Sequence, residues 1–134
     1  MSLYELPPGA AISPYHVHHA NEELLVVLSG RPLLRTPDGY RSLEPGAVVA
    51  FPRGADGAHR VSNPSDEDVR VLAISTMRYP EVADYPTTGS RLTLTAPGEG
   101  KAYSAAGEVP FLENLLETMR LDAREEDQRG TSTS

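Results

Sequence analysis

The chain has 134 residues, of which 39% are hydrophobic and 23% charged, a composition typical of one globular domain and unlike that of a disordered chain. Twelve basic against 19 acidic residues give a formal net charge of -7, which leaves no broad cationic surface and argues against nucleic acid as a partner. Cysteine is absent, so disulfides, thiolate metal sites and cysteine nucleophiles are excluded, and any metal must bind to nitrogen and oxygen.

The first 85 residues consist of short apolar and β-branched runs separated by turn residues, without a helical period, and this predicts an all-β region. The run 23–29 is apolar without alternation and is expected to form a central strand that is covered on both faces. Turns are expected at 37–39 and 44–46, where proline and glycine occupy turn positions. Seven or eight strands at this spacing predict a sandwich or barrel, with strands at 23–29, 31–36, 47–51, 59–63 and 68–76.

The sequence changes in character after Pro86. Residues 87–109 are rich in glycine and small side chains and are interpreted as a linker or arm. From Phe111 onward, apolar residues at helical spacing predict one amphipathic helix that packs on the barrel or on a neighbouring subunit: Leu112, Leu115, Leu116 and Met119. The charged and Thr/Ser-rich residues 122–134 are expected to fray. The predicted organisation is a β-barrel over 1–86, a linker over 87–109, and a helix with a flexible tail over 110–134.

Three of the four histidines lie close together in the sequence, at His16, His18 and His19, and the fourth is His59. Residues two apart in a strand project to the same face, so His16 and His18 can direct two imidazoles into one cavity while His19 points away. Glu23 follows after a short connection that can bring its carboxylate beside these rings. His59 starts another predicted strand and can supply a fourth group.

These residues resemble the two motifs of the cupin superfamily. The first motif, G(X)5HXH(X)3-4E(X)6G, is matched by His16, His18, Glu23 and Gly30. The second motif, G(X)5PXG(X)2H(X)3N, is matched by Gly46, Pro52, Gly54, His59 and Asn63. Gly9 lies six residues before His16 instead of five, and four residues instead of two separate Gly54 from His59; both differences fall in connections, where insertions are tolerated. The resemblance covers about residues 2–86 and is strongest to small bacterial single-domain cupins.

The resemblance implies an all-β jelly roll, or double-stranded β-helix barrel, in which four side chains converge on a divalent transition metal: His16, His18, Glu23 and His59. Three imidazoles and one carboxylate suit Fe, Mn, Ni, Zn or Cu and leave positions open for water or a chelating oxygen ligand. By strand alternation, four further residues are expected to line the pocket: Leu25, Val27, Val61 and Asn63. Tyr15 and Arg60 are expected to point away from the ion, with Arg60 at the surface.

Two alternatives concern the site itself. Glu22 also fits the spacing from His18, but it would share a strand face with Leu24, and its interval to Gly30 is seven residues, so Glu23 is favoured. The histidines could also be hydrogen-bonded structural residues of a barrel that binds no metal. Because all four ligand types are retained, metal binding is the favoured hypothesis.

The predicted function follows from this site. The first hypothesis is a metal-dependent enzyme that acts on a small organic molecule, either as an oxygenase or as an isomerase or lyase. The alternative is a binding or sensor protein in which the ion anchors a small metabolite without turnover. The chain has no apolar run long enough to span a membrane, so we expect a soluble, cytoplasmic protein without a membrane partner.

A homodimer is also predicted. The outward face of the 23–29 strand is apolar, at Leu24, Val26 and Leu28, and must be covered. Either a neighbouring subunit or the C-terminal helix could cover it.

Overall fold

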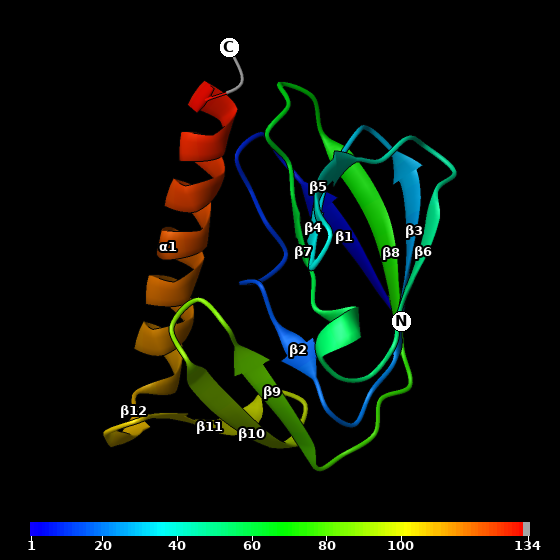
Figure 1. Cartoon of the computed structure of the whole chain (residues 1–134). Helices are drawn as coiled ribbons and strands as arrows, with labels where there is room; N and C mark the ends of the chain where they lie inside the picture. Colours follow the sequence, from blue (N-terminus) through cyan, green and yellow to red (C-terminus); the bar gives the residue numbers. More distant parts are fainter. Residues whose placement is uncertain (133–134) are drawn as a thin grey trace.

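The computed structural model describes residues 1–132, which contain twelve strands, one 3-10 helix and one α-helix (Figure 1). The strands are β1 (Ser2–Leu6), β2 (Val17–His18), β3 (Glu23–Ser29), β4 (Leu33–Thr36), β5 (Gly39–Ser42), β6 (Val48–Phe51), β7 (Arg60–Ser62), β8 (Val69–Ser75), β9 (Glu81–Tyr85), β10 (Ser90–Ala96), β11 (Glu99–Ser104) and β12 (Gly107–Val109). The helices are η1 (Ala55–Gly57) and α1 (Phe111–Ser132). All strand pairings are antiparallel, and the predicted all-β jelly-roll barrel with a C-terminal helix is confirmed.

The barrel is built from three sheets, with strand orders β1-β8-β3-β6, β5-β4-β7 and β12-β11-β10-β9-β2. β3 is central in the first sheet, as its unbroken apolar run predicts, because it pairs with both β6 and β8. Its inward side chains, Leu25 and Val27, pack in the main core with Leu34, Val69 and Val71.

Gly30 ends β3 in a conformation that requires glycine. Its φ is +79°, and a Cβ added there would lie 2.6 Å from the carbonyl oxygen of Asp68. The backbone of β8 therefore approaches β3 more closely than a side chain at position 30 would permit. The motif glycine at this position has a packing role in the sheet.

The interpretation of residues 87–109 as a linker is wrong. This segment contains β10, β11 and β12, and β10 pairs with β9 on one side and β11 on the other. Leu92 and Ala102 from these strands form a second buried apolar core together with Ala83 and Tyr85. The segment does contain a local strand pattern, because Leu92 and Leu94 alternate with polar residues in β10, but the composition of residues 87–109 as a whole indicates a linker.

The helix is longer than predicted, and its buried face is different. Residues 122–132, expected to fray, continue α1, while residues 133–134 lie outside the described part of the chain. Leu112 and Leu116 are 62% and 57% exposed, although the apolar spacing places them on the packed face. Phe111 and Leu115 contact the second core, and the buried stripe then continues with Thr118 and Asp122, so it changes from apolar to polar along the helix.

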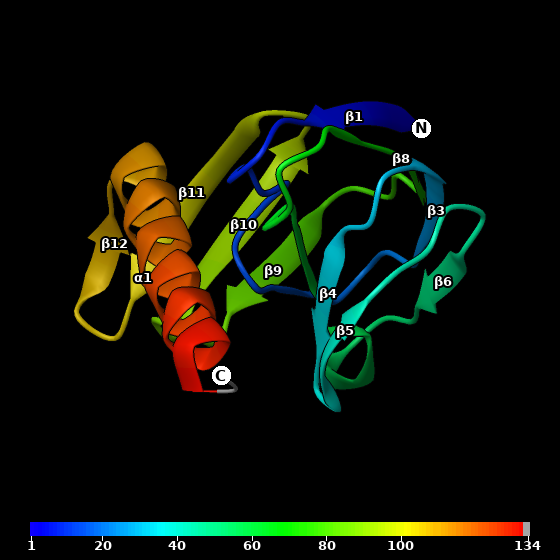
Figure 2. The same cartoon turned by 90° about the horizontal axis from the view of Figure 1, so that it is seen from above.

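The helix lies on the opposite side of the molecule from β3 and β6, beside the five-stranded sheet (Figure 2). It therefore does not cover the outward face of the four-stranded sheet. Several apolar side chains of that face are exposed, among them Leu3, Leu28, Val48 and Ile74. Within residues 1–132, no helix combines the length and the apolar character needed to cross a membrane.

Candidate metal centre

The predicted ligand residues lie at the ends of strands that face one another across the barrel. His18 is the last residue of β2, and Glu23 is the first residue of β3. His16 and His59 precede β2 and β7 and form an isolated antiparallel bridge, in which each amide donates to the carbonyl oxygen of the other residue, at 3.2 and 3.1 Å. Two of the four groups are thus joined through the backbone itself.

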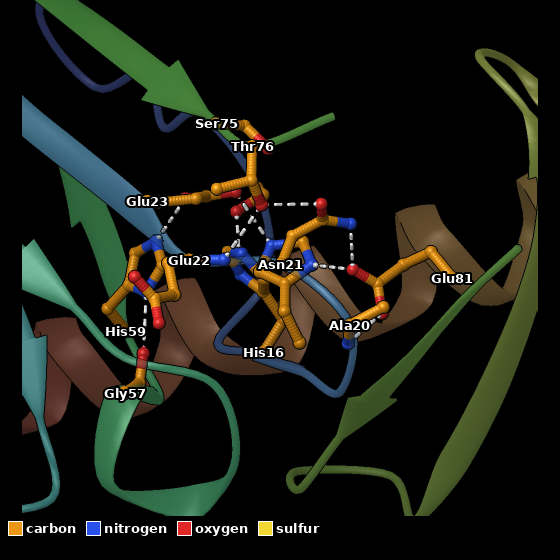
Figure 3. Close-up of polar contacts among 12 residues, drawn as sticks. His16, Ala20, Asn21, Glu22, Glu23, Gly57, His59, Ser75, Thr76 and Glu81 are labelled. Carbon is orange, nitrogen blue, oxygen red and sulfur yellow. Dashed lines mark hydrogen bonds and ion pairs between the residues drawn. The ribbon is translucent and has the colours of Figure 1, made fainter. Parts of the chain in front are cut away.

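The four side chains converge. The carboxylate of Glu23 bridges two imidazoles. Its Oε2 lies 3.0 Å from Nε2 of His59 (Figure 3), and its Oε1 lies 2.8 Å from Nε2 of His18. The ring of His16 lies between the other two rings, 4.7 Å from His18 and 4.5 Å from His59 between centroids. Donor atoms of His16, His18 and Glu23 all lie within 4.8 Å of one another. The structure therefore brings together all four residues that the motifs single out.

Hydrogen bonds orient the imidazoles of His16 and His59 through Nδ1, and an acidic side chain faces the same nitrogen of His18. Nδ1 of His16 lies 2.7 Å from the carbonyl oxygen of Pro14, and Nδ1 of His59 lies 2.8 Å from that of Gly57. A carbonyl oxygen only accepts, so both Nδ1 atoms donate, and Nε2 is the ring nitrogen that remains to face the centre. Nδ1 of His18 faces Oε2 of Glu81 at 3.4 Å. Such partners on the far nitrogen are the usual support of histidines that bind metals.

Glu81 is a site residue that the sequence reasoning missed. Its side chain is only 2% exposed, and its Oε1 accepts hydrogen bonds from the backbone amides of His19, Ala20 and Val82, at 3.1, 2.9 and 2.8 Å. Its Oε2 accepts a further hydrogen bond from the side chain of Asn21. Glu81 thereby holds the loop between β2 and β3 and faces His18, although no local pattern in the sequence distinguishes it from other acidic residues.

The structure distinguishes the two candidate carboxylates. Glu23 points to the histidines, whereas the side chain of Glu22 is exposed, and the Glu22 amide donates to Oγ1 of Thr76 at 3.2 Å. This difference follows from strand alternation, since neighbouring residues of a strand project to opposite faces. His19 also points away, as expected, and its Nε2 lies 2.6 Å from Oδ2 of Asp84.

Burial and charge shift the pKa values of the cluster in different directions. Burial, together with the neighbouring His59, lowers the pKa of His16 to about 3, so this ring stays neutral. Burial also lowers the pKa of His18, but the carboxylates of Glu23 and Glu81 outweigh burial, and the net pKa is raised. For Glu23, burial raises the pKa, but the contacts with His18 and His59 lower it by more. The net pKa is therefore lowered, and the carboxylate stays ionised.

The cluster opens into a cavity of about 260 Å³. Its walls are largely apolar and include residues from β1, β6, β9, β10 and the first turn of α1: Tyr4, Phe51, Ala83, Tyr85, Leu92, Leu94 and Phe111. Of the four predicted pocket residues, Leu25 and Val61 line this cavity. Val27 and Asn63 do not line it, so their prediction as pocket residues is wrong.

Their actual surroundings explain this correction. Val27 lies deeper along β3 and packs in the main core. Asn63 uses its side chain to hold the turn after β7, donating to the carbonyl oxygens of Leu6 and Glu67 at 2.8 and 2.7 Å. Sharing a face with a ligand residue does not suffice when the strand runs away from the site.

The residues that flank His16 and His59 do point away from the centre, but not into solvent. The Tyr15 ring packs under the guanidinium of Arg35, 4.0 Å from its centroid. Arg60 is only 4% exposed and forms an ion pair with Glu126 of α1, so its prediction as a surface residue is wrong. The helix, whose polar face could not be located from its apolar spacing, covers this side of the barrel.

The donor set fits a transition-metal ion. Three imidazole nitrogens and one carboxylate suit Fe, Mn, Ni, Zn or Cu, whose bonds to such ligands are about 2.1 Å long. Both ring nitrogens of His18 are buried and make no hydrogen bond of good geometry. Buried polar atoms are rarely left in this state, and a cation bound at Nε2 would satisfy one of them.

Comparison with known proteins defines the class. The cupin domain model Cupin_2 matches residues 2–75, which is more than half of the chain, and the chain therefore belongs to the cupin family. The match ends at the last residue of β8, so the strands β9 to β12 and α1 lie beyond it. A comparison with curated proteins found no match.

Two solved structures resemble the chain beyond this domain. One is a protein of Acidithiobacillus ferrooxidans ATCC 23270, provisionally named a sugar phosphate isomerase, with 35% identity, a TM-score of 0.70 and coverage of 78% of this chain and 65% of that one. The other is a sugar phosphate isomerase of the cupin superfamily from Silicibacter pomeroyi DSS-3, with 29% identity, a TM-score of 0.64 and coverage of 80% and 62%. The chain spans less than two thirds of the length of either protein.

Proposed function

We propose that this cupin is a metal-dependent enzyme that acts on a small, oxygen-bearing organic molecule, with four side chains as metal ligands: His16, His18, Glu23 and His59. The observation that carries the proposal is the convergence of these side chains at the wall of one cavity, with the Nδ1 of each imidazole facing an oxygen acceptor and its Nε2 directed inward. The apolar walls around them exclude water from a bound molecule.

Isomerisation is the reaction class that we favour over oxygenation. The similarity to two proteins named as sugar phosphate isomerases supports this choice. A divalent ion, when bound, polarises a carbonyl group and makes the loss of a proton from the neighbouring carbon easier. Tyr85 lines the same cavity, and burial raises its pKa to about 12, so its hydroxyl stays protonated and can donate a hydrogen bond to a substrate oxygen.

The charge of the cavity limits which part of a substrate can enter. Among the residues that the structure describes, the lining includes no lysine or arginine. A phosphate group would be left without a partner there, and its burial would be unfavourable. We therefore infer that the hydroxyl and carbonyl oxygens of the substrate enter the cavity and that any phosphate remains outside it.

A binding protein without turnover is the second candidate. It is favoured by one observation: apart from the four proposed ligands, the described residues of the lining include only tyrosines as titratable groups. A general base with a pKa near neutrality is therefore not evident in the cavity.

Metal uptake tests the common part of both candidates. After removal of metal with a chelator, the protein is incubated separately with Fe, Mn, Ni, Zn and Cu and analysed for its elements. We expect close to one ion per chain, and a sharp loss of occupancy in His18→Ala and His59→Ala. Glu22→Gln is the matched control, because it changes a carboxylate next to Glu23 that does not face the site. An absence of stoichiometric uptake with every metal would contradict the metal site.

Turnover separates the two candidates. The loaded protein is incubated with aldose and ketose phosphates in D2O, and deuterium incorporation next to the carbonyl is followed by NMR. We expect incorporation that depends on the metal and is lost in His59→Ala. A thermal stabilisation by these compounds without incorporation would favour the binding protein.

A cytoplasmic location stays a prediction. We also propose a homodimer, formed through the outward face of the four-stranded sheet. The exposed apolar residues Leu3, Val48 and Ile74 support this interface. Glu5 and Arg70 lie on the same sheet and pair with each other, so these two charges do not oppose the contact of two copies. Size-exclusion chromatography with light scattering should give twice the chain mass for the wild type, and a monomer for Val48→Lys. A monomeric wild type would contradict this interface.

A further inference from the structure

Two of the proposed ligands, His16 and His59, lie on short segments that have little support from the sheets. They form an isolated bridge, β2 has only two residues, and β7 has three. By contrast, Glu23 starts the seven-residue strand β3, which is paired on both sides. A metal site needs its donors held to within about 0.5 Å, so the bridge requires support from elsewhere.

That support comes from one face of α1. The backbone amide of Tyr15, directly before His16, donates to Oδ2 of Asp122 at 2.8 Å. The guanidinium of Arg60, directly after His59, pairs with Oε2 of Glu126. Asp122 and Glu126 are four residues apart, so they lie on the same side of the helix, one turn apart.

Both carboxylates are anchored by additional contacts. Oδ1 of Asp122 accepts from Oγ1 of Thr87 at 2.5 Å and faces the guanidinium of Arg35 at 3.3 Å. Oε1 of Glu126 accepts from Oγ of Ser62, in β7, at 2.6 Å. Asp122 is only 1% exposed, so the carboxylate is shielded from water and its hydrogen bonds are strong.

We propose that α1 is a positioning element for the metal centre: Asp122 and Glu126 hold the residues next to His16 and His59 and thereby set the position of both imidazoles. Neither carboxylate faces the cavity, so both act through Tyr15 and Arg60. The C-terminal segment beyond the matched cupin domain is in this way part of the site. This inference rests on the proposed metal function only where Co²⁺ binding is measured; the amide hydrogen exchange is independent of it.

The test uses the full chain and three variants that each remove one negative charge from α1. Asp122→Asn and Glu126→Gln alter the two positioning contacts, and Glu117→Gln is the control, because Glu117 is exposed and pairs with Arg120 of the same helix. Amide hydrogen exchange of the metal-free protein is measured at His16 and His59, and at Val27 as a reference in the core. Co²⁺ affinity and the visible absorption spectrum of bound Co²⁺ are measured in parallel.

We expect Asp122→Asn and Glu126→Gln each to accelerate exchange at the bridge amides at least about tenfold, with little change at Val27. The same variants should weaken Co²⁺ binding at least about tenfold and alter the Co²⁺ spectrum, as loss of outer-shell support does in metal sites. Glu117→Gln should match the wild type in every measurement. If one variant fails to fold, the other still tests the proposal.

Two results would overturn the proposal. One is exchange at His16 and His59 that stays at the wild-type rate in the folded variants. The other is acceleration by the same factor at Val27, which would show that the helix contributes to global stability only. If the wild type binds no Co²⁺ while the bridge amides respond as expected, the metal function fails and the positioning role of α1 is supported.

Discussion

The main core of the barrel and the seam between α1 and the barrel are buried to a similar degree but are built from different chemistry. In the core, Leu34, Val69 and Val71 are fully buried among other apolar side chains. In the seam, the equally buried positions are polar or charged, as at Thr118, Asp122 and Arg60. Apolar packing depends on volume and is non-directional, whereas the seam depends on particular partners at particular distances. The two regions should therefore respond to different substitutions.

The largest effect is expected when a charge is removed from the seam. Asp122→Ala removes the acceptor of the Tyr15 amide and of the Thr87 hydroxyl and one of the two carboxylates that face Arg35, so we expect the free energy of unfolding to fall by about 3–5 kcal/mol. Urea unfolding followed by circular dichroism measures it. A loss below about 1 kcal/mol would show that the seam is not held by this carboxylate.

Removal of volume is the corresponding test of the core. Leu34→Ala should lower the free energy of unfolding by about 3 kcal/mol, because it removes a fully buried side chain and leaves a cavity. Leu34→Met preserves most of the volume and should lower it by less than about 1.5 kcal/mol. Equal losses for both variants, in the same unfolding measurement, would contradict a core that depends on volume.

An isosteric exchange sharpens the comparison further. Val71→Thr keeps the shape but introduces a hydroxyl into the apolar core, and we expect a loss of about 2 kcal/mol, within the range for a buried polar group without a partner. Thermal unfolding followed by calorimetry is suitable for this measurement. A neutral result would mean that the hydroxyl finds a partner, and a structure of the variant would identify it.

The pH dependence is expected to give the smallest change in the free energy of unfolding, counted per pH unit. Because the pKa of His16 is about 3 in the folded protein and about 6.5 when unfolded, unfolding takes up a proton between these values. Stability from this group is present above pH 6.5 and is lost as the pH falls towards 3. In metal-free His16→Asn, the slope of the unfolding free energy below pH 6.5 should be shallower by up to about 1.4 kcal/mol per pH unit. Identical slopes in variant and wild type would contradict a buried neutral His16.

Local patterns sufficed for much of the barrel. The strand at 23–29 was predicted with its observed bounds, because its apolar run and the glycine that ends it are encoded next to each other. The grouping of the four proposed ligand residues could be predicted because motif spacing carries it. Glu81 could not be found in this way, since its partners lie about 60 residues earlier in the chain.

The C-terminal half was predicted less well, for two different reasons. In β10, Leu92 and Leu94 alternate with polar residues, which is the local pattern of a half-buried strand, but the glycine-rich and small-residue composition of the whole segment favoured a linker instead. The polar stripe of α1 resembles a solvated surface in the sequence, and only the arginines and amides of the barrel turn it into a packed face. Such contacts between distant residues leave no local periodicity.

The placement of the four proposed donors within the first 59 residues has a consequence for biosynthesis. A ribosome produces the chain from its N-terminus, so all the groups that would hold an ion leave the exit tunnel before Asp122 and Glu126 have been made. A nascent chain therefore contains all four proposed donors before the proposed positioning contacts of α1 can form. If the proposed site binds an ion, tight binding is expected only once α1 has been synthesised, so it would follow the early collapse of the barrel.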